Sequence, residues 1–177
     1  INSMERIALP SDSASSVALL QYLISNRGLE PKYIEMGPDL DSMLSDCDGA
    51  LLIGDRALEG ARANPEMVRM DLGSEWLEVS GSPMVFGVFA ARKDSNLEHV
   101  KSAYDALIAR LESFENNELV REDVIRVSSV KSAQSPSRLE RYFGEVINRM
   151  DSTDMFGLKL FLEKACGMDD EIIMAWD

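Results

Sequence analysis

The chain has 177 residues, of which 45% are hydrophobic and 28% charged, values that are ordinary for a globular protein with a sizeable core. Its net charge of −13 argues against non-specific nucleic-acid binding, which needs clustered Lys and Arg, and an anionic ligand would need locally arranged donors. No run of the sequence approaches about 18 apolar residues, so we predict no membrane span.

The first fifty residues alternate between strand and helix patterns. We expect short apolar strands at residues 4–9, 32–36 and 49–53, with helices near residues 17–26 and 39–45 between them. The order strand, helix, strand, helix, strand with short connections implies parallel strands joined by right-handed crossovers. The sequence therefore predicts an α/β fold.

Residues 49–92 contain two apolar runs, 50–53 and 84–91, each with the length of a buried strand. The first run ends at Gly54 and Asp55, where the chain must turn. Ligands bind at the carboxyl ends of strands in open α/β sheets, so this turn is a candidate site.

The rest of the chain has mainly helical periodicity. Leu72 and Trp76 should point inward from the helix expected at residues 71–79. An acidic tail at 169–177 carries Trp176. The expected helices lie at residues 57–63, 71–79, 97–115, 119–130, 139–150 and 155–166, with a short strand at 68–70 and a linker at 132–137.

A hydroxyl-rich segment follows the first strand. Ser13, Ser15 and Ser16 stand just before the first helix, at positions where serine caps helices. Together with the first free amides of that helix, these hydroxyls are suited to binding a carboxylate. From the residues alone two interpretations stay open: an anion site, or one serine that acts only as an N-cap.

The turn after the third strand carries three candidate residues. Gly54 lets the backbone approach a ligand because it has no side chain. Asp55 is expected to fix a ligand hydroxyl, to orient a neighbouring donor, or only to cap a helix that starts at Arg56. Arg56 is expected either to pair with a ligand carboxylate or to point into solvent. The single histidine, His99, falls on the polar side of helix 97–115 and is expected to be solvated.

Several short motifs occur in order: LIGDRAL at 52–58, DLG at 71–73, EW at 75–76 and GSPMVFGV at 81–88. They resemble the chorismate dehydratase family of the futalosine route to menaquinone. The resemblance implies a type II periplasmic-binding-protein-like fold, with two α/β lobes around a cleft.

The resemblance also implies a division of the chain. Residues 4–92 would form an α/β substrate-binding lobe, and residues 93–177 a helical C-terminal extension that belongs to the other lobe. The resemblance covers nearly the whole chain but only the later part of the family. We therefore expect the family's N-terminal segment to have no counterpart here.

The resemblance favours the anion-site interpretation of the serines, because family members carry Ser-x-Thr-Ser at this point. It adds Ser80, which stands for the threonine of the family's Thr-Gly-Leu-Pro turn. The family's proton-transfer groups are implied to lie chiefly in the N-terminal segment, so the catalytic residues stay unassigned. The predicted substrate-binding residues are Ser13, Ser15, Ser16, Gly54, Asp55 and Ser80.

The function that the resemblance implies is dehydration of chorismate to 3-[(1-carboxyvinyl)oxy]benzoate, a carbon–oxygen lyase reaction, or the substrate-binding part of that enzyme. The alternatives are a non-enzymatic carboxylate-binding protein of the same fold and an oligomerisation module that uses the C-terminal helices. We expect no metal, cofactor, nucleic acid or membrane partner, and a homodimer or a second polypeptide that supplies the missing segment. Cys47 and Cys166 lie far apart in the sequence without a neighbouring histidine, which favours reduced thiols in the cytoplasm.

Overall fold

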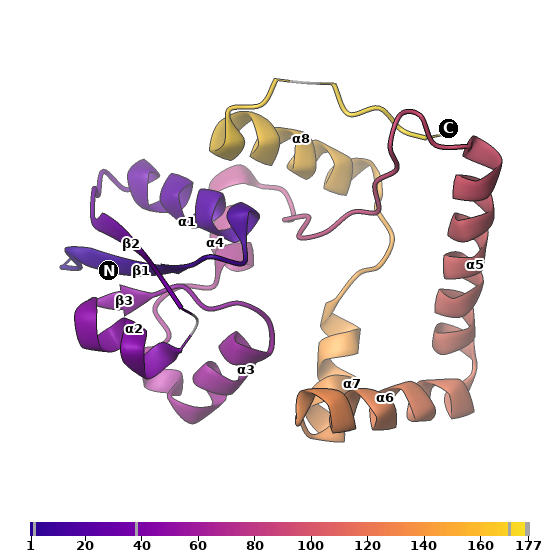
Figure 1. Cartoon of the computed structure of the whole chain (residues 1–177), viewed down its shortest axis with the longest axis horizontal. Helices are drawn as coiled ribbons and strands as arrows, with labels where there is room; N and C mark the ends of the chain where they lie inside the picture. The colour runs from indigo at the N-terminus through magenta and orange to yellow at the C-terminus, as the bar shows by residue number, and fades with distance from the viewer. Residues whose placement is uncertain (2, 38, 170, 176–177) are drawn as a thin grey trace. The chain divides into compact units, whose positions relative to one another are not determined.

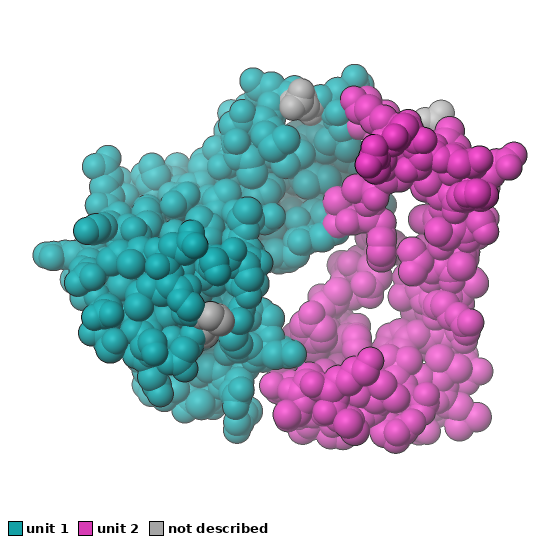
Figure 2. Space-filling model, viewed as in Figure 1, with its two compact units in different colours: residues 1–87, 150–172 teal, residues 88–149, 173–177 magenta. Residues whose placement is uncertain are grey.

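The computed structural model describes residues 1, 3–37, 39–169 and 171–175. The chain forms two compact units (Figure 2). Residues 1–87 and 150–172 form the first, which we call the sheet unit, and residues 88–149 and 173–177 form the second, the helical unit. Trp176 of the acidic tail lies outside the described residues. How these units correspond to the two lobes of the implied fold stays a prediction.

Within the described ranges the chain holds eight α-helices and one three-stranded parallel sheet, so it is a mixed α/β protein. The strands are β1 (Arg6–Pro10), β2 (Lys32–Met36) and β3 (Gly49–Ala50), in the order β2-β1-β3 (Figure 1). The predicted alternation of parallel strands and helices is confirmed. The third strand is shorter than expected, since only two of its residues pair with β1.

The central strand β1 sends alternate side chains to the two faces of the sheet, as the strand period of two requires. On one face, side chains of β1 pack with helix α1 (Ala14–Asn26) in a cluster of Ile7, Leu9, Leu20, Ile24 and Leu51. On the other face, Ala8 packs with Met43 and Cys47, which lie on and just after helix α2 (Leu40–Asp46). Both faces of the sheet are therefore covered by helices.

A third cluster extends the core of the sheet unit beyond the sheet. It joins α1, α4 (Leu72–Ser80) and α8 (Ser152–Cys166) through Leu19, Leu23, Trp76 and Phe161. The ring of Trp76 is fully buried, with its centroid 5.9 Å from that of Tyr22 and 6.0 Å from that of Phe161. The prediction that Trp76 points inward is confirmed. Between β3 and α4 lie helix α3 (Gly54–Ala63) and the 3₁₀ turn η1 (Pro65–Met67).

The helical unit contains α5 (Leu97–Asn116), α6 (Glu118–Ser132) and α7 (Pro136–Glu145). Asn117 ends α5 and also caps α6, because its side-chain oxygen accepts hydrogen bonds from the N–H groups of Leu119 and Val120. Consecutive helices pack on one another, α5 on α6 and α6 on α7. Among the described residues of this unit only Ile125, Gln134 and Leu139 are buried.

The predicted strand at 84–91 is wrong, because none of these residues belongs to a strand. Phe86, Val88 and Phe89 are exposed, Phe89 to 89% of its surface. An apolar run becomes a strand only where a second strand can pair with it. In the described part of the chain the sheet ends at β3, and no strand lies alongside this run.

Two smaller predictions are also corrected. Residues 68–70 form no strand, and the helix expected at 139–150 ends at Glu145. The next residues, Val146 and Ile147, are β-branched, and Val146 is extended with φ −91° and ψ 123°. In the described ranges, no helix combines the length and the apolar character needed to cross a bilayer.

Candidate functional site

The strand order β2-β1-β3 creates a point where the chain changes direction across the sheet. From β1 the chain passes through α1 to β2 on one side, and it then returns to β3 on the other side (Figure 1). In open α/β sheets, ligands bind outside the carboxyl ends of the strands at such a switch point. We call the residues there, 11–16 after β1 and 51–56 after β3, the β1–β3 edge.

The serine segment lies at this edge, and Ser13 is the N-cap of α1. Its Oγ accepts a hydrogen bond of 3.3 Å from the N–H of Ser16 and donates one of 2.8 Å to the Ser16 Oγ. The capping interpretation is therefore confirmed for Ser13. Ser15 is exposed, and the Ser16 hydroxyl keeps its own hydrogen for another acceptor.

Helix α3 begins at the same edge without a side-chain cap. Its N-cap is Ile53, which has no acceptor, so the first amides of α3 have no side-chain partner there. Gly54 has a φ of +58°, which favours glycine, and a Cβ at this position would stand in open space. Two helices therefore begin at one sheet edge, and helix N-termini are suited to binding an anion.

Asp55 lies inside the first turn of α3 and is exposed. The expectation that it caps a helix starting at Arg56 is wrong, because the helix starts at Gly54. A carboxylate in the first turn interacts favourably with the helix dipole. The structure therefore leaves the side chain of Asp55 accessible at the β1–β3 edge.

An ion pair joins the two halves of this edge. The Arg56 Nη2 lies 2.5 Å from the Asp12 Oδ2, and the two side chains are 38% and 49% exposed. The hydrogen bond from the Arg56 guanidinium holds the pKa of the Asp12 carboxyl below its ordinary value. Sequence reasoning missed Asp12, although its place next to Ser13 and the presence of a single cation, Arg56, within residues 51–56 were usable signals.

Ser80 has a local role in the structure. It is the last residue of α4, and its Oγ donates to the carbonyl of Ser82 and accepts from the N–H of Ser82, both at 3.1 Å. Gly81 follows with φ +71° and turns the chain. Among the described residues no hydrogen bond or ion pair connects Ser80 with the β1–β3 edge, so its predicted ligand role stays a prediction.

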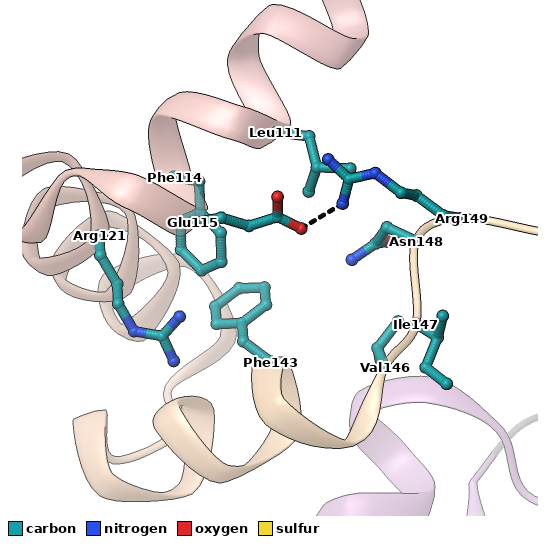
Figure 3. A pocket seen from close by; sticks show the side chains of 9 residues that line it. All are labelled: Leu111, Phe114, Glu115, Arg121, Phe143, Val146, Ile147, Asn148 and Arg149. Atoms are coloured by element: carbon teal, nitrogen blue, oxygen red, sulfur yellow. Dashed lines mark hydrogen bonds and ion pairs between the residues drawn. The ribbon is translucent and has the colours of Figure 1, made fainter.

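The helical unit contains a pocket of about 270 Å³ near the end of α5 (Figure 3). Phe114 and Phe143 meet there edge to face, with ring centroids 5.2 Å apart. Its charged side chains are already paired, Arg149 with Glu115 at 2.5 Å and Arg121 with Glu140 at 2.9 Å. The hydrogen bond from Arg149 lowers the pKa of Glu115. Arg149 and Arg121, like Arg56, therefore each already have a carboxylate partner.

The described residues contain no group of three or more His, Cys, Asp or Glu side chains that could hold a metal ion. His99 is exposed on α5, as expected. Cys47 and Cys166 are free thiols, and burial raises the pKa of Cys166.

Comparison with known proteins identifies the family. A family model described as "Menaquinone biosynthesis" matches residues 1–166. The chain belongs to this family. It is also 31% identical over 181 aligned residues to the chorismate dehydratase of Thermus thermophilus, with 90% of this chain covered. The chain spans 62% of the length of that relative.

Proposed function

We propose that this chain is part of a chorismate dehydratase, which converts chorismate to 3-[(1-carboxyvinyl)oxy]benzoate in menaquinone biosynthesis. The observation that carries the proposal is the 31% identity to a chorismate dehydratase over 90% of the chain. The family match over residues 1–166 agrees with it. The two free thiols agree with a cytoplasmic location, which is part of the proposal.

We also propose that the sheet unit is a lobe of a type II periplasmic-binding-protein-like fold. The parallel order β2-β1-β3 and the helices on both faces support this assignment. So does the position of five of the six predicted ligand residues, all but Ser80, after the carboxyl ends of β1 and β3. In this proposal the β1–β3 edge is the part of the substrate site that the sheet unit supplies.

The proposed reaction removes one proton from a ring carbon and a hydroxyl group from another, and together they leave as water. The ring becomes aromatic, and no oxidant or reductant is consumed. The reaction needs the two carboxylates of the substrate held in fixed orientation while a proton leaves carbon. Positioning is the contribution that the residues of the β1–β3 edge are suited to make.

Four residues of the edge, Ser13, Ser15, Ser16 and Asp55, have proposed roles. The hydroxyls of Ser15 and Ser16 and the first amides of α1 and α3 bind a substrate carboxylate, because they are donors at two helix N-termini. Ser13 holds this segment in shape by capping α1. Asp55 accepts a hydrogen bond from a substrate hydroxyl. The groups that move the proton are not assigned.

The test is turnover by the full-length gene product. The protein is incubated with chorismate, and the products are separated and identified by mass spectrometry. We expect a product lighter than chorismate by one water, with the spectrum of a substituted benzoate. Binding of chorismate without turnover by intact protein would contradict the enzyme and support a carboxylate-binding protein of the same fold.

A further inference from the structure

We propose that Arg56 binds a substrate carboxylate at the β1–β3 edge and that Asp12 positions its guanidinium group. This inference rests on the proposed function, since it concerns the same site. It assigns to Arg56 the ligand role that the sequence left open, and to Asp12 a role that sequence reasoning missed.

The first argument is the charge of the segments that form the site. Residues 10–16 and 50–58, together with the Ser80 turn at 71–84, contain one cation, Arg56. The first two of these segments also contain Asp12 and Asp55. The whole chain has a net charge of −13, which repels a substrate with two carboxylates unless a local cation offsets it. Arg56 is the group that these segments offer for that purpose.

The second argument is the geometry of the guanidinium group. Arg56 lies in the first turn of α3, and its Nη2 reaches across to Asp12, the residue before the N-cap of α1. The group is therefore held between the two helix N-termini that supply the other donors. A guanidinium has five N–H donors, and the contact with Asp12 occupies one of its three nitrogens. The remaining donors suit a carboxylate, which a guanidinium binds in a planar, two-pronged way.

The third argument concerns Asp12. An arginine side chain has many rotamers and loses much entropy when it is fixed, so a partner that orders it in advance favours ligand binding. Asp12 does this from the neighbouring loop, and its side chain remains about half exposed. The alternative is that the pair only ties two loops together. In that case removal of Arg56 would lower stability and leave recognition of the substrate unchanged.

The experiment measures steady-state turnover of chorismate by full-length Arg56→Gln and Arg56→Lys proteins. We expect Arg56→Gln to raise KM about 10- to 100-fold, as for a lost hydrogen bond to a charged group, with kcat changed less than about threefold. Arg56→Lys should raise KM less, because it keeps the charge and loses the planar fork. Added salt should raise the KM of the unchanged protein more steeply than that of Arg56→Gln.

Asp12 and a matched control complete the set. Asp12→Asn should raise KM by a smaller factor than Arg56→Gln. Asp12→Glu keeps the carboxylate and should raise KM less than Asp12→Asn. Arg62→Gln removes an exposed arginine from the other end of the same helix and should leave KM unchanged. Thermal unfolding midpoints of all variants show whether each is folded.

A folded Arg56→Gln protein with unchanged KM would overturn the inference, as would an equal rise of KM in Arg62→Gln. Turnover by the unchanged protein in that experiment would leave the proposed function intact. If the unchanged protein binds chorismate without converting it, its affinity replaces KM in every comparison. The proposed function then fails. Weaker binding by Arg56→Gln would still support the roles of Arg56 and Asp12, and unchanged binding would contradict them.

Discussion

The two units differ in how many of their hydrophobic side chains are buried. Among the described residues, twelve of the fourteen buried hydrophobic side chains lie in the sheet unit, and only Ile125 and Leu139 lie in the helical unit. Val130 and Ile147 of the helical unit are each 80% exposed. The sheet unit therefore owes its stability mainly to a shared core, whereas the helical unit depends more on caps and on contacts between consecutive helices.

This difference also separates the candidate functions of the two units. The sheet unit places its polar edge on a rigid core, so donors from two loops are held in one place. The pocket of the helical unit lies in a part of the structure where only Ile125, Gln134 and Leu139 are buried among the described residues. A rigid element is the better support for a site that must orient a substrate. The comparison therefore predicts that core changes in the sheet unit cost more stability than equivalent changes in the helical unit.

The largest effect is expected at Trp76. Trp76→Ala should destabilise the sheet unit by about 3–5 kcal/mol, because it leaves a cavity between Tyr22 and Phe161. Leu139→Ala in the helical unit should cost about 2 kcal/mol, near the lower end for a buried leucine. Urea unfolding followed by far-ultraviolet circular dichroism measures both changes.

Trp76→Phe is the control for this change. The indole Nε1 of Trp76 is buried without a hydrogen-bond partner among the described residues, and phenylalanine removes that donor while keeping an aromatic ring. The loss should therefore be clearly smaller than for alanine. Equal losses of stability in Trp76→Ala and Leu139→Ala would contradict the proposed difference between the cores of the two units.

A pair of glycines gives the next largest contrast. Gly157 is buried in α8, and a Cβ there would overlap the carbonyl oxygen of Pro83. Gly157→Ala should cost about 1–3 kcal/mol, because the helix must move away from that backbone. Gly144 lies in α7 with open space around it, so Gly144→Ala should stabilise by up to about 1 kcal/mol.

Thermal unfolding midpoints of the two alanine variants decide the sign of each change. A lower midpoint for Gly157→Ala beside an unchanged or higher midpoint for Gly144→Ala would support the difference in packing between the two units. Two changes of the same sign and size would show that the packing of α8 within the sheet unit is not tight, and they would contradict the account of its core.

The smallest effects are expected from acid. Hydrogen bonds lower the pKa of four exposed carboxyl groups in the described sheet unit, Asp12, Asp39, Asp48 and Asp151. At Asp48 the donors are the N–H groups of Arg6 and Glu5, which tie the start of β3 to the start of β1. A lowered folded pKa gives stability above the unfolded pKa, and this is lost as the pH falls through the folded pKa.

The measurement compares thermal unfolding midpoints at pH 7 and pH 3, a range that includes the ordinary Asp pKa of 3.8. Asp48→Asn should lower the midpoint slightly at pH 7 and should lose less than the unchanged protein on acidification, because the titrating group is gone. An identical acid loss in both proteins would contradict the role given to the Asp48 hydrogen bonds.

The sequence was a good guide wherever a local pattern decides the structure. Ser13 as an N-cap and the inward Trp76 follow from capping chemistry and helical spacing, and the parallel order of the sheet follows from short connections. The run at 84–91 was misjudged because an apolar strand is defined by its partner, and periodicity within the run says nothing about one.

The candidate site was predictable only in part. Strand ends and serines indicated where it lies, since both are local features of the sequence. The contact between Asp12 and Arg56 joins residues 44 positions apart, and its existence depends on the side-by-side placement of β1 and β3. Ser80 was predicted only through the family resemblance, and its side chain is engaged with Ser82.

The most direct test of the central claim, that the β1–β3 edge binds a substrate carboxylate, is calorimetric titration of the full-length protein with chorismate. Ser15→Ala with Ser16→Ala should weaken binding about 10-fold or more, since two hydroxyl donors are lost while Ser13 still caps α1. The unfolding midpoint should stay close to that of the unchanged protein. Unchanged affinity in the folded double variant, or no binding by the unchanged protein, would contradict the claim.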